Sequence, residues 1–447
     1  MKNDRSFLHT VCSLAIPVAL QSMLQSSFSI VDQIMIDQLG SVSIAGVGLA
    51  GKFSSMYSVI ISAVGAVAGI LISQYLGQEN QREVKRSFYV NLWLGLGIAA
   101  LFSVLCMVFP RQIMGLYTTD PATRQAAAEY LSIIAGTFVP MAGATLLSTL
   151  FRCIEKARLP LYASLVSAGL NTVINYVLIF GKCGFAPMGA RGAAIATLIS
   201  QAANTVLMLL LLPRSTLSMV QKPKINDRFQ WKQYLSMLLP VLACEALWSL
   251  GENVYAAIYG HMSTDSTAAM TLTNPVQGLV IGALCGLSQA AGVIVGKRLG
   301  HHQFDEAYSA AKKLLLYGFI GSLFLSLAVV FTSSAYVQIY QVEDSVKTLT
   351  CQILWVYALM APVKVLNMIL GGGVIRSGGK AHYVMLVDTI GTWCFGVPMG
   401  LLSAFVFQLP IPYVYLMLSL EECVRFVISV FIFHGRKWMN QLKTAQR

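Results

Sequence analysis

The chain has 447 residues, of which 56% are hydrophobic and only 11% are charged. Soluble proteins carry about 25% charged residues, so this composition excludes an ordinary soluble domain and indicates an integral membrane protein. Lys and Arg outnumber Asp and Glu by 31 to 19, which gives a formal net charge of +12. Most of these bases lie in alternate predicted loops and at both ends of the chain, so we assign the excess to the positive-inside bias and expect no nucleic-acid partner.

Hydropathy predicts twelve membrane-spanning helices. In chain order they cover residues 11–37, 45–75, 88–110, 127–151, 160–181, 191–212, 235–260, 269–296, 313–333, 350–373, 383–407 and 411–434. The polar stretch 213–234 is the only long linker, and it predicts two six-helix bundles, 1–212 and 235–447. An even number of spans together with the charge bias places both termini on the cytoplasmic side of the inner membrane.

The first span contains an acidic residue, Asp32, which shares one helical face with Gln21, Gln25 and Phe28. A charged group at bilayer depth is costly and usually faces a cavity or a partner, so we predict a cation-coupling role for Asp32. The alternative is an interfacial Asp with no role in transport. In the fifth span, Asn171 and Asn175 lie one turn apart, and their amides could coordinate a cation or form only interhelical hydrogen bonds.

The seventh span carries acidic and aromatic side chains along one face. At intervals of three and four residues these are Glu245, Trp248, Glu252, Tyr255 and Tyr259. Carboxylates and aromatic rings together attract lipophilic organic cations, so we predict a substrate-binding surface here, which Gln25 and Phe28 of the first span would extend. The alternative is a Trp/Tyr packing seam in which one of the two Glu residues pairs with Lys364.

The last three spans contain further charges. Lys364 could pair with Asp388 or Glu245, either as a structural lock or as a gate. Within the twelfth span, Glu421, Glu422 and Arg425 have the helical spacing at which charges neutralise one another. The predicted interior therefore holds six acids and two bases: Asp32, Glu245, Glu252, Asp388, Glu421 and Glu422 against Lys364 and Arg425. This excess predicts a cavity that attracts cations.

An internal repeat relates the two halves. At a shift near 223 residues, Pro17 aligns with Pro240, Gly69 with Gly292, and Gly77 with Gly300. A duplicated helical bundle is typical of secondary transporters. The sequence has no phosphate-binding loop and no zinc motif, and its nine cysteines are scattered, so we expect no cofactor and no resident metal. Transport would then be driven by an ion gradient.

Four stretches resemble the bacterial branch of the multidrug and toxic compound extrusion (MATE) antiporters. They are "IPVALQSMLQSSFSIVDQIMIDQLGSVSIAGVGLA", "SAGLNTVINYVLIFG…MGARGAAIATLISQ", "PVLACEALWSLGENVYAAIYGHMSTDSTAAM" and "GGGVIRSGGKAHYVMLVDTIGTWCFGVPMG". The resemblance covers nearly the whole chain. It implies an all-α integral membrane protein of twelve helices, with two pseudo-twofold-related six-helix bundles forming a V, that exports organic cations in exchange for H⁺ or Na⁺.

The resemblance also implies roles for individual residues. Asp32 matches the family's first-span acid, a proposed protonation or sodium site. Asn171 matches a polar coupling position, and Asn175 stands where some members carry an Asp. Glu245 matches a seventh-span acid implicated in cation binding.

One departure from the family pattern concerns the tenth span. The acid that some sodium-coupled members carry there is missing, and Lys364 and Val365 occupy that neighbourhood. This departure favours protons over sodium as the coupling ion, although Na⁺ at Asp32 stays open.

The sequence therefore predicts a monomeric antiporter, not an enzyme, that exports cationic amphiphilic drugs or metabolites by alternating access, with membrane lipid around it. Two alternatives remain. A flippase for lipid-linked saccharides would be expected to have a more cationic cavity, and a membrane-embedded enzyme would need a nucleophile and a base that no motif supplies.

Overall fold

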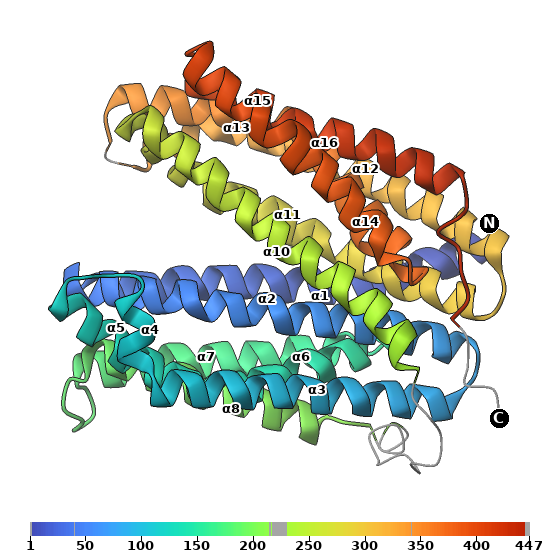
Figure 1. Cartoon of the computed structure of the whole chain (residues 1–447), viewed down its shortest axis with the longest axis horizontal. Coiled ribbons are helices and arrows are strands. Elements are labelled where there is room, and N and C mark those ends of the chain that lie inside the picture. Colours follow the sequence, from blue (N-terminus) through green and yellow to red (C-terminus); the bar gives the residue numbers. More distant parts are fainter. Residues whose placement is uncertain (1, 40, 214–215, 217–229, 341, 443–447) are drawn as a thin grey trace. The chain divides into compact units, whose positions relative to one another are not determined.

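The computed structural model describes residues 2–39, 41–213, 216, 230–340 and 342–442. Every regular element in these ranges is a helix (Figure 1). Eleven helices of the described part are long and apolar enough to cross a membrane. The prediction of an all-α multi-pass membrane protein is confirmed.

The predicted twelfth span, residues 411–434, is helix α16 (Ile411–His434), which is 24 residues long. Its length suffices for a spanning segment. Glu421, Glu422 and Arg425 lie in its middle. Because of these three charges, α16 is not among the eleven helices that are apolar enough to cross a membrane. The polarity of this helix is explained below by the partners of these three side chains.

Contacts divide the chain into two compact units. We call residues 20–72 and 80–226 the N-terminal unit, and residues 1–19, 73–79 and 227–447 the C-terminal unit. Two short segments that precede the predicted linker, 1–19 and 73–79, therefore make their contacts with the second half of the chain. Most of that linker, residues 214–215 and 217–229, lies outside the described residues, so the predicted boundaries at 212 and 235 stay a prediction.

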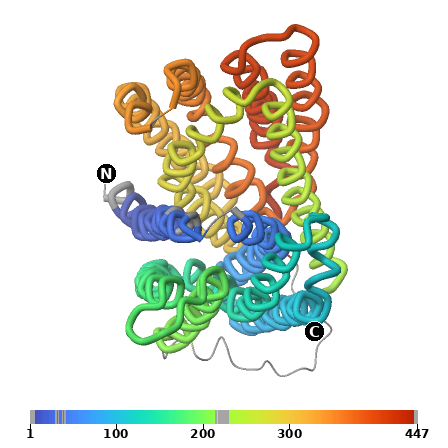
Figure 2. The backbone as a smooth tube through the Cα atoms, turned by 90° about the vertical axis from the view of Figure 1, so that its left-hand side faces the viewer, coloured from blue at the N-terminus to red at the C-terminus, as the bar shows by residue number. Residues whose placement is uncertain are grey.

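The N-terminal unit consists of helices joined by short turns. In chain order they are the later part of α1 (Lys2–Asp37), most of α2 (Ser41–Gly77), α3 (Gln81–Val108), the short α4 (Pro110–Gly115), α5 (Pro121–Ile134), which continues through the 3₁₀ turn η1 (Ala135–Thr137) into α6 (Phe138–Cys153), then α7 (Arg158–Phe180) and α8 (Gly189–Leu210). Helices α7 and α8 lie side by side (Figure 2).

Local sequence signals set several of these helix ends. Asp120 caps α5 by accepting a hydrogen bond from the Thr123 backbone N–H at 2.8 Å, with Pro121 at the first helical position. Helix α7 ends at Gly181, whose φ of +67° is a left-handed conformation that favours glycine.

In the C-terminal unit, regular α-helices come first. They are α10 (Trp231–Met262), α11 (Thr264–Gly300), α12 (Phe304–Gln338) and α13 (Asp344–Asn367). Helices α11, α12 and α13 pack against one another (Figure 1).

The helices that follow in this unit are interrupted by π-helical turns. Helix α13 runs into the π-helix η2 (Met368–Ile375). After it come α14 (Ala381–Asp388), the π-helix η3 (Thr389–Gly396), α15 (Val397–Leu401), the π-helix η4 (Leu402–Val406) and α16. Glycines are frequent in these segments, as in Gly371–Gly373, and glycine weakens regular helix. Such π-helical turns occur often at functional sites.

The last described residues tie the end of α2 to the C-terminal unit. The Gln74 side chain donates to the backbone carbonyls of Ser377 at 2.7 Å and Asn440 at 3.1 Å, and its Oε1 accepts from the Leu442 N–H at 2.8 Å. Trp438 beside them is fully buried. A Cβ on Gly300 of α11 would meet the Gln74 carbonyl, so glycine is required for this close approach of α2 and α11. These contacts explain why residues 73–79 belong to the C-terminal unit.

Candidate functional site

A polar cluster lies inside the N-terminal unit, between α1, α7 and α8. Asn175 of α7 donates to Asp32 Oδ1 at 2.7 Å. With its amide turned to satisfy both of its polar atoms, Asn171 donates to the two carboxylate oxygens of Asp32 at 2.9 and 3.1 Å and accepts from Ser200 Oγ of α8 at 3.2 Å. The spacing of the two Asn residues, one helical turn apart, directs both amides at the same carboxylate. The structure thus brings together the three predicted cation-coupling residues, Asp32, Asn171 and Asn175.

The partners of Asp32 are uncharged. Among the described residues Asp32 makes no ion pair, and its side chain is only partly exposed. Asn175 is 1% exposed, and its Oδ1 is buried with no hydrogen-bond partner in the described part of the chain. A carboxylate beside an unused acceptor is a site that a proton or a small cation can satisfy. This geometry is consistent with the coupling role predicted for Asp32.

The rest of the predicted stripe on α1 is less engaged. Gln21 donates to Ser164 Oγ of α7 at 2.9 Å, which fastens α1 to α7 about two turns before Asn171. Gln25 is exposed and Phe28 is half-buried. The structure gives neither of them a polar partner among the described residues, and their predicted role in substrate binding stays a prediction.

The C-terminal unit holds its acids in a different way. Glu245 of α10 pairs with Arg376 at 3.1 Å, and the two side chains are 26% and 14% exposed. Our expectation that Lys364 would be the partner of Glu245 is wrong. The predicted count of two interior bases is also incomplete, because Arg376 is a third one. The sequence suggested a loop position for Arg376, since it follows a glycine-rich segment.

Asp388, at the end of α14, has two partners. It accepts a hydrogen bond from the Cys244 thiol at 2.7 Å and lies 3.8 Å from Arg425. The predicted pair of Asp388 with Lys364 is therefore replaced by a pair with Arg425. The Cys244 thiol also accepts from Arg376 at 3.6 Å, so one small side chain connects the Glu245–Arg376 pair to the Asp388–Arg425 pair.

Arg425 is the centre of this network. It pairs with Glu421 at 3.4 Å and with Glu422 at 3.8 Å, which confirms that these three charges neutralise one another within α16. It also donates to the Thr392 hydroxyl of η3. A Cβ at Gly391 would collide with the Arg425 side chain, so the glycine in the π-helix leaves room for the guanidinium. The network explains how α16 carries three charges at membrane depth.

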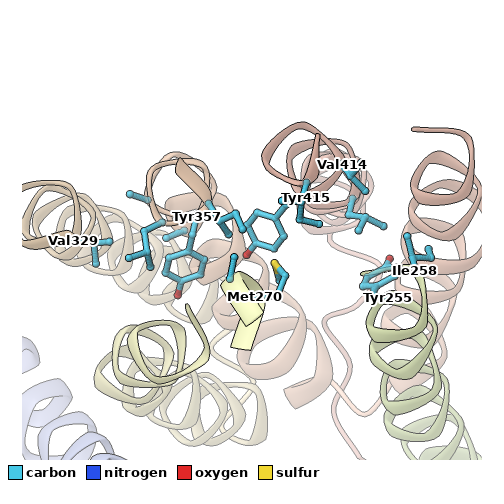
Figure 3. Close-up of a cluster of buried hydrophobic side chains, with 14 of the residues drawn as sticks. Tyr255, Ile258, Met270, Val329, Tyr357, Val414 and Tyr415 are labelled. Atoms are coloured by element: carbon cyan, nitrogen blue, oxygen red, sulfur yellow. The ribbon is translucent and has the colours of Figure 1, made fainter. Parts of the chain in front are cut away.

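A cavity of about 240 Å³ lies within the C-terminal unit, between α10, α11, α13 and α16. Its charged lining residues are Glu252, Lys364, Glu421 and Glu422. Its aromatic lining residues are Tyr255, Tyr259, Tyr357 and Tyr415, and Asn274 and Gln277 add amides. Figure 3 shows Met270 and Tyr415 between Tyr357 on one side and Tyr255 on the other. The cavity therefore combines carboxylates with aromatic walls.

Only part of the predicted row of acidic and aromatic side chains on α10 lines this cavity. Glu252, Tyr255 and Tyr259 line it, and the Tyr255 hydroxyl donates to Glu421. Glu245 is not among the lining residues, and Trp248 is 49% exposed and does not line the cavity either. The helical period brings Glu252, Tyr255 and Tyr259 onto one face, whereas Glu245, about two turns before Glu252, faces Arg376.

Other side chains at the site carry no sequence signal of their own. Cys244, Thr392 and Gln277 contact the charged network or the cavity, and each stands in an otherwise ordinary apolar segment. Within the described ranges, no group of three or more His, Cys, Asp and Glu side chains is placed to hold a metal ion.

Comparison with known proteins gives the family. A family model described as MatE matches residues 17–177 and 240–402. The two matches begin at residues 17 and 240, 223 positions apart, which confirms the internal repeat. Together they cover more than half of the chain.

Several relatives and solved structures agree with this match. An uncharacterized transporter, YisQ, from Bacillus subtilis is 19% identical over 440 residues, 98% of this chain and 96% of the relative. A probable multidrug resistance protein, NorM, from Bacillus thuringiensis subsp. konkukian is 22% identical over 430 residues, 90% of each. A crystal structure of a mutant of the Vibrio cholerae MATE transporter VcmN superposes with a TM-score of 0.89 at 14% identity, covering 97% of this chain and 98% of that one.

The similarity to solved structures establishes the fold, and the two matches of the family model establish the family. This chain belongs to the MatE family, the bacterial multidrug and toxic compound extrusion transporters.

Proposed function

We propose that this protein is an ion-coupled antiporter that exports organic cations or metabolites by alternating access, with protons rather than sodium as the coupling ion. The observation that carries the proposal is the environment of Asp32. Its carboxylate is held by the amides of Asn171 and Asn175 and makes no ion pair among the described residues. An incoming cation can therefore take its negative charge without first displacing a protein cation.

Helix α1 offers a route from this site to the rest of the molecule. Residues 2–19 of α1 belong to the C-terminal unit and residues 20–37 to the N-terminal unit. Pro17 lies near the point of division and removes one backbone hydrogen bond from the helix. Neutralising Asp32 would weaken the hydrogen bonds between α7 and the later part of α1. Because α1 is one continuous helix with residues in both units, a movement of its later part would act on both.

The substrate would bind in the C-terminal cavity. Glu252 supplies a carboxylate, and Tyr255 and Tyr259 supply aromatic faces, which together attract organic cations. Three carboxylates against one lysine line this cavity, and this polarity supports cation transport over the transport of a pyrophosphate-linked saccharide. We further propose that the monomer lies in the inner membrane with both termini in the cytoplasm.

The proposal is tested with purified protein in proteoliposomes, with pH and sodium gradients imposed separately. An electrogenic exchange that moves one net charge inward through 100 mV has about 2.3 kcal/mol available, enough for nearly two decades of substrate gradient. We expect a proton gradient to drive accumulation of a permanent organic cation, and Asp32→Asn to abolish it while the protein stays folded. Glu129→Gln is the matched control, because Glu129 lies in the same unit and pairs with Arg191 at 2.8 Å away from the cluster. Accumulation at the wild-type rate by the Asp32→Asn protein would show that the coupling assignment is wrong.

A further inference from the structure

Two opposite charges at the C-terminal cavity lack a hydrogen bond or a close ion pair among the described residues. Glu252 of α10 and Lys364 of α13 both line it. In the described part of the chain, neither side chain makes a hydrogen bond or an ion pair. Lys364 lies within electrostatic reach of Glu422 and, more weakly, of Glu252 and Glu421. They do not pair with each other, and because both line the cavity, a ligand bound there can reach both.

The other charges at this cavity are already satisfied. Glu421 accepts from the Tyr255 hydroxyl and pairs with Arg425 at 3.4 Å. Glu422 accepts from the Asn367 amide at 2.9 Å and pairs with Arg425 at 3.8 Å. The charges left for a ligand are thus one carboxylate and one ammonium.

An unpaired ion at membrane depth is costly, and a residue of this kind usually marks a substrate or ion pathway. A purely cationic ligand would satisfy Glu252 and would add a like charge beside Lys364. A ligand that carries both an ammonium and a carboxylate would satisfy both side chains at once. Resting on the function proposed above, we infer that this cavity binds small zwitterions, with the ligand ammonium at Glu252 and its carboxylate at Lys364.

The size and the walls of the cavity restrict the ligand further. Pockets for drug-sized molecules have volumes of about 300–1,000 Å³, whereas this cavity has a volume of about 240 Å³. Tyr259, Tyr357 and Tyr415 supply aromatic faces, and the amides of Asn274 and Gln277 supply donors and acceptors. The best ligand is therefore a compound of amino-acid or dipeptide size with an aromatic or apolar side group.

The experiment compares three ligands that share one scaffold and differ in net charge. Phenylalanine is the zwitterion, phenylalanine methyl ester the cation, and N-acetylphenylalanine the anion. The same three forms of glycylphenylalanine place the two charges farther apart. Binding to the full-length purified protein is measured by calorimetry at neutral pH.

We expect the zwitterion of at least one scaffold to bind tenfold or more tightly than both of its singly charged forms. Lys364→Met should remove the preference over the ester, and Glu252→Gln the preference over the N-acetyl form. Lys347→Met is the control, because Lys347 lies on the same helix, pairs with Asp344 at 3.3 Å and does not line the cavity. This control should bind all six compounds like the wild type.

A doubly exchanged protein covers the case in which a single variant does not fold. Glu252→Lys combined with Lys364→Glu keeps one charge of each sign and should still prefer the zwitterion. Equal binding of the zwitterion and the ester by the wild type, or no binding of any of the six compounds, overturns the inference. Cation export that still depends on Asp32 would then leave the proposed antiport intact. Zwitterion binding without any ion-driven transport would reject the antiport and keep the inference.

Discussion

In the N-terminal unit, Asp32 is held by the neutral amides of Asn171 and Asn175, whereas in the C-terminal unit Asp388, Glu421 and Glu422 share the guanidinium of Arg425. The two matches of the family model, residues 17–177 and 240–402, place Asp32 in the first repeated segment and Asp388 in the second. Their chemistry nevertheless differs, because neutral amide donors favour the ionised carboxylate less strongly than a guanidinium, which adds its own positive charge.

This difference separates two tasks. The amide-held acid can gain or lose a cation at small cost, so it suits ion coupling. The guanidinium-held acids are fixed, and two of them, Glu421 and Glu422, line a cavity where, among the described residues, Glu252 and Lys364 make no hydrogen bond or ion pair. The following changes test this separation, starting with the largest expected effect.

Removing the central guanidinium should unfold the C-terminal unit. Arg425→Met leaves Asp388, Glu421 and Glu422 without their shared partner, and an uncompensated buried charge costs about 3–5 kcal/mol. The free energy of unfolding in detergent measures the loss. Arg436→Met is the control: this arginine is 52% exposed and pairs with exposed Asp305, so we expect a change below about 1 kcal/mol. Equal stabilities of the two variants would contradict a structural role for Arg425.

Removing one amide should change coupling without changing the fold. Asn175→Ala deletes the donor 2.7 Å from Asp32 Oδ1, and a hydrogen bond to a charged group contributes about 1.5–3 kcal/mol. The ionised carboxylate becomes less stable, so the pH of half-maximal transport should rise by about one to two units. Gln125→Ala, on an exposed part of α5, should leave the profile unchanged. An unaltered pH profile in Asn175→Ala would show that this amide has no part in ion coupling.

A methyl group at Gly396 should damage the cavity wall. Its Cβ would collide with the Tyr255 hydroxyl and the Glu421 carboxylate, so Gly396→Ala breaks their hydrogen bond and costs about 1–3 kcal/mol of stability. Ligand affinity should fall as well, because both side chains line the cavity. At Gly278, a Cβ meets nothing within 4 Å, which makes Gly278→Ala the matched control. Wild-type affinity in Gly396→Ala would place the ligand elsewhere.

The smallest effect separates the pH dependence of folding from that of transport. Hydrogen bonds from Thr123 hold the pKa of the exposed Asp120 carboxyl below its usual range. Asp120 therefore stabilises the folded state above the unfolded-state pKa of about 3.9, and this contribution is lost as the pH falls through the lower folded-state pKa. Melting temperatures between pH 5 and pH 2 should decline slightly less in Asp120→Asn than in the wild type. An effect of Asp120→Asn on transport at neutral pH would be unexpected.

Much of the fold could be predicted from local sequence features. Apolar runs located the spanning helices, and glycine and proline marked several of their ends, as at Pro121 and Gly181. Spacing on one helix also placed Asn171 with Asn175, and Glu421 with Arg425, because residues three or four apart share a helical face. The π-helical turns after Asn367 and Asp388 were missed, since the same apolar and glycine-rich strings fit a regular span.

Partners on different helices could not be assigned in this way. Glu245 and Arg376 are 131 positions apart, and the sequence offered each of them other possible ion-pair partners. Lys364 was expected to pair with Asp388 or Glu245, yet both acids are held by arginines and Lys364 faces the cavity.

By itself, the sequence determined a duplicated, all-helical membrane protein of the MatE family with acids at the depth of the membrane, because hydropathy, helical period and repetition are properties of the chain. Only the tertiary structure decided which of those acids are neutralised and which stay free. A charge is satisfied by whatever lies within about 4 Å of it, and in a helical bundle those neighbours come from different helices whose rotation and depth no local pattern specifies.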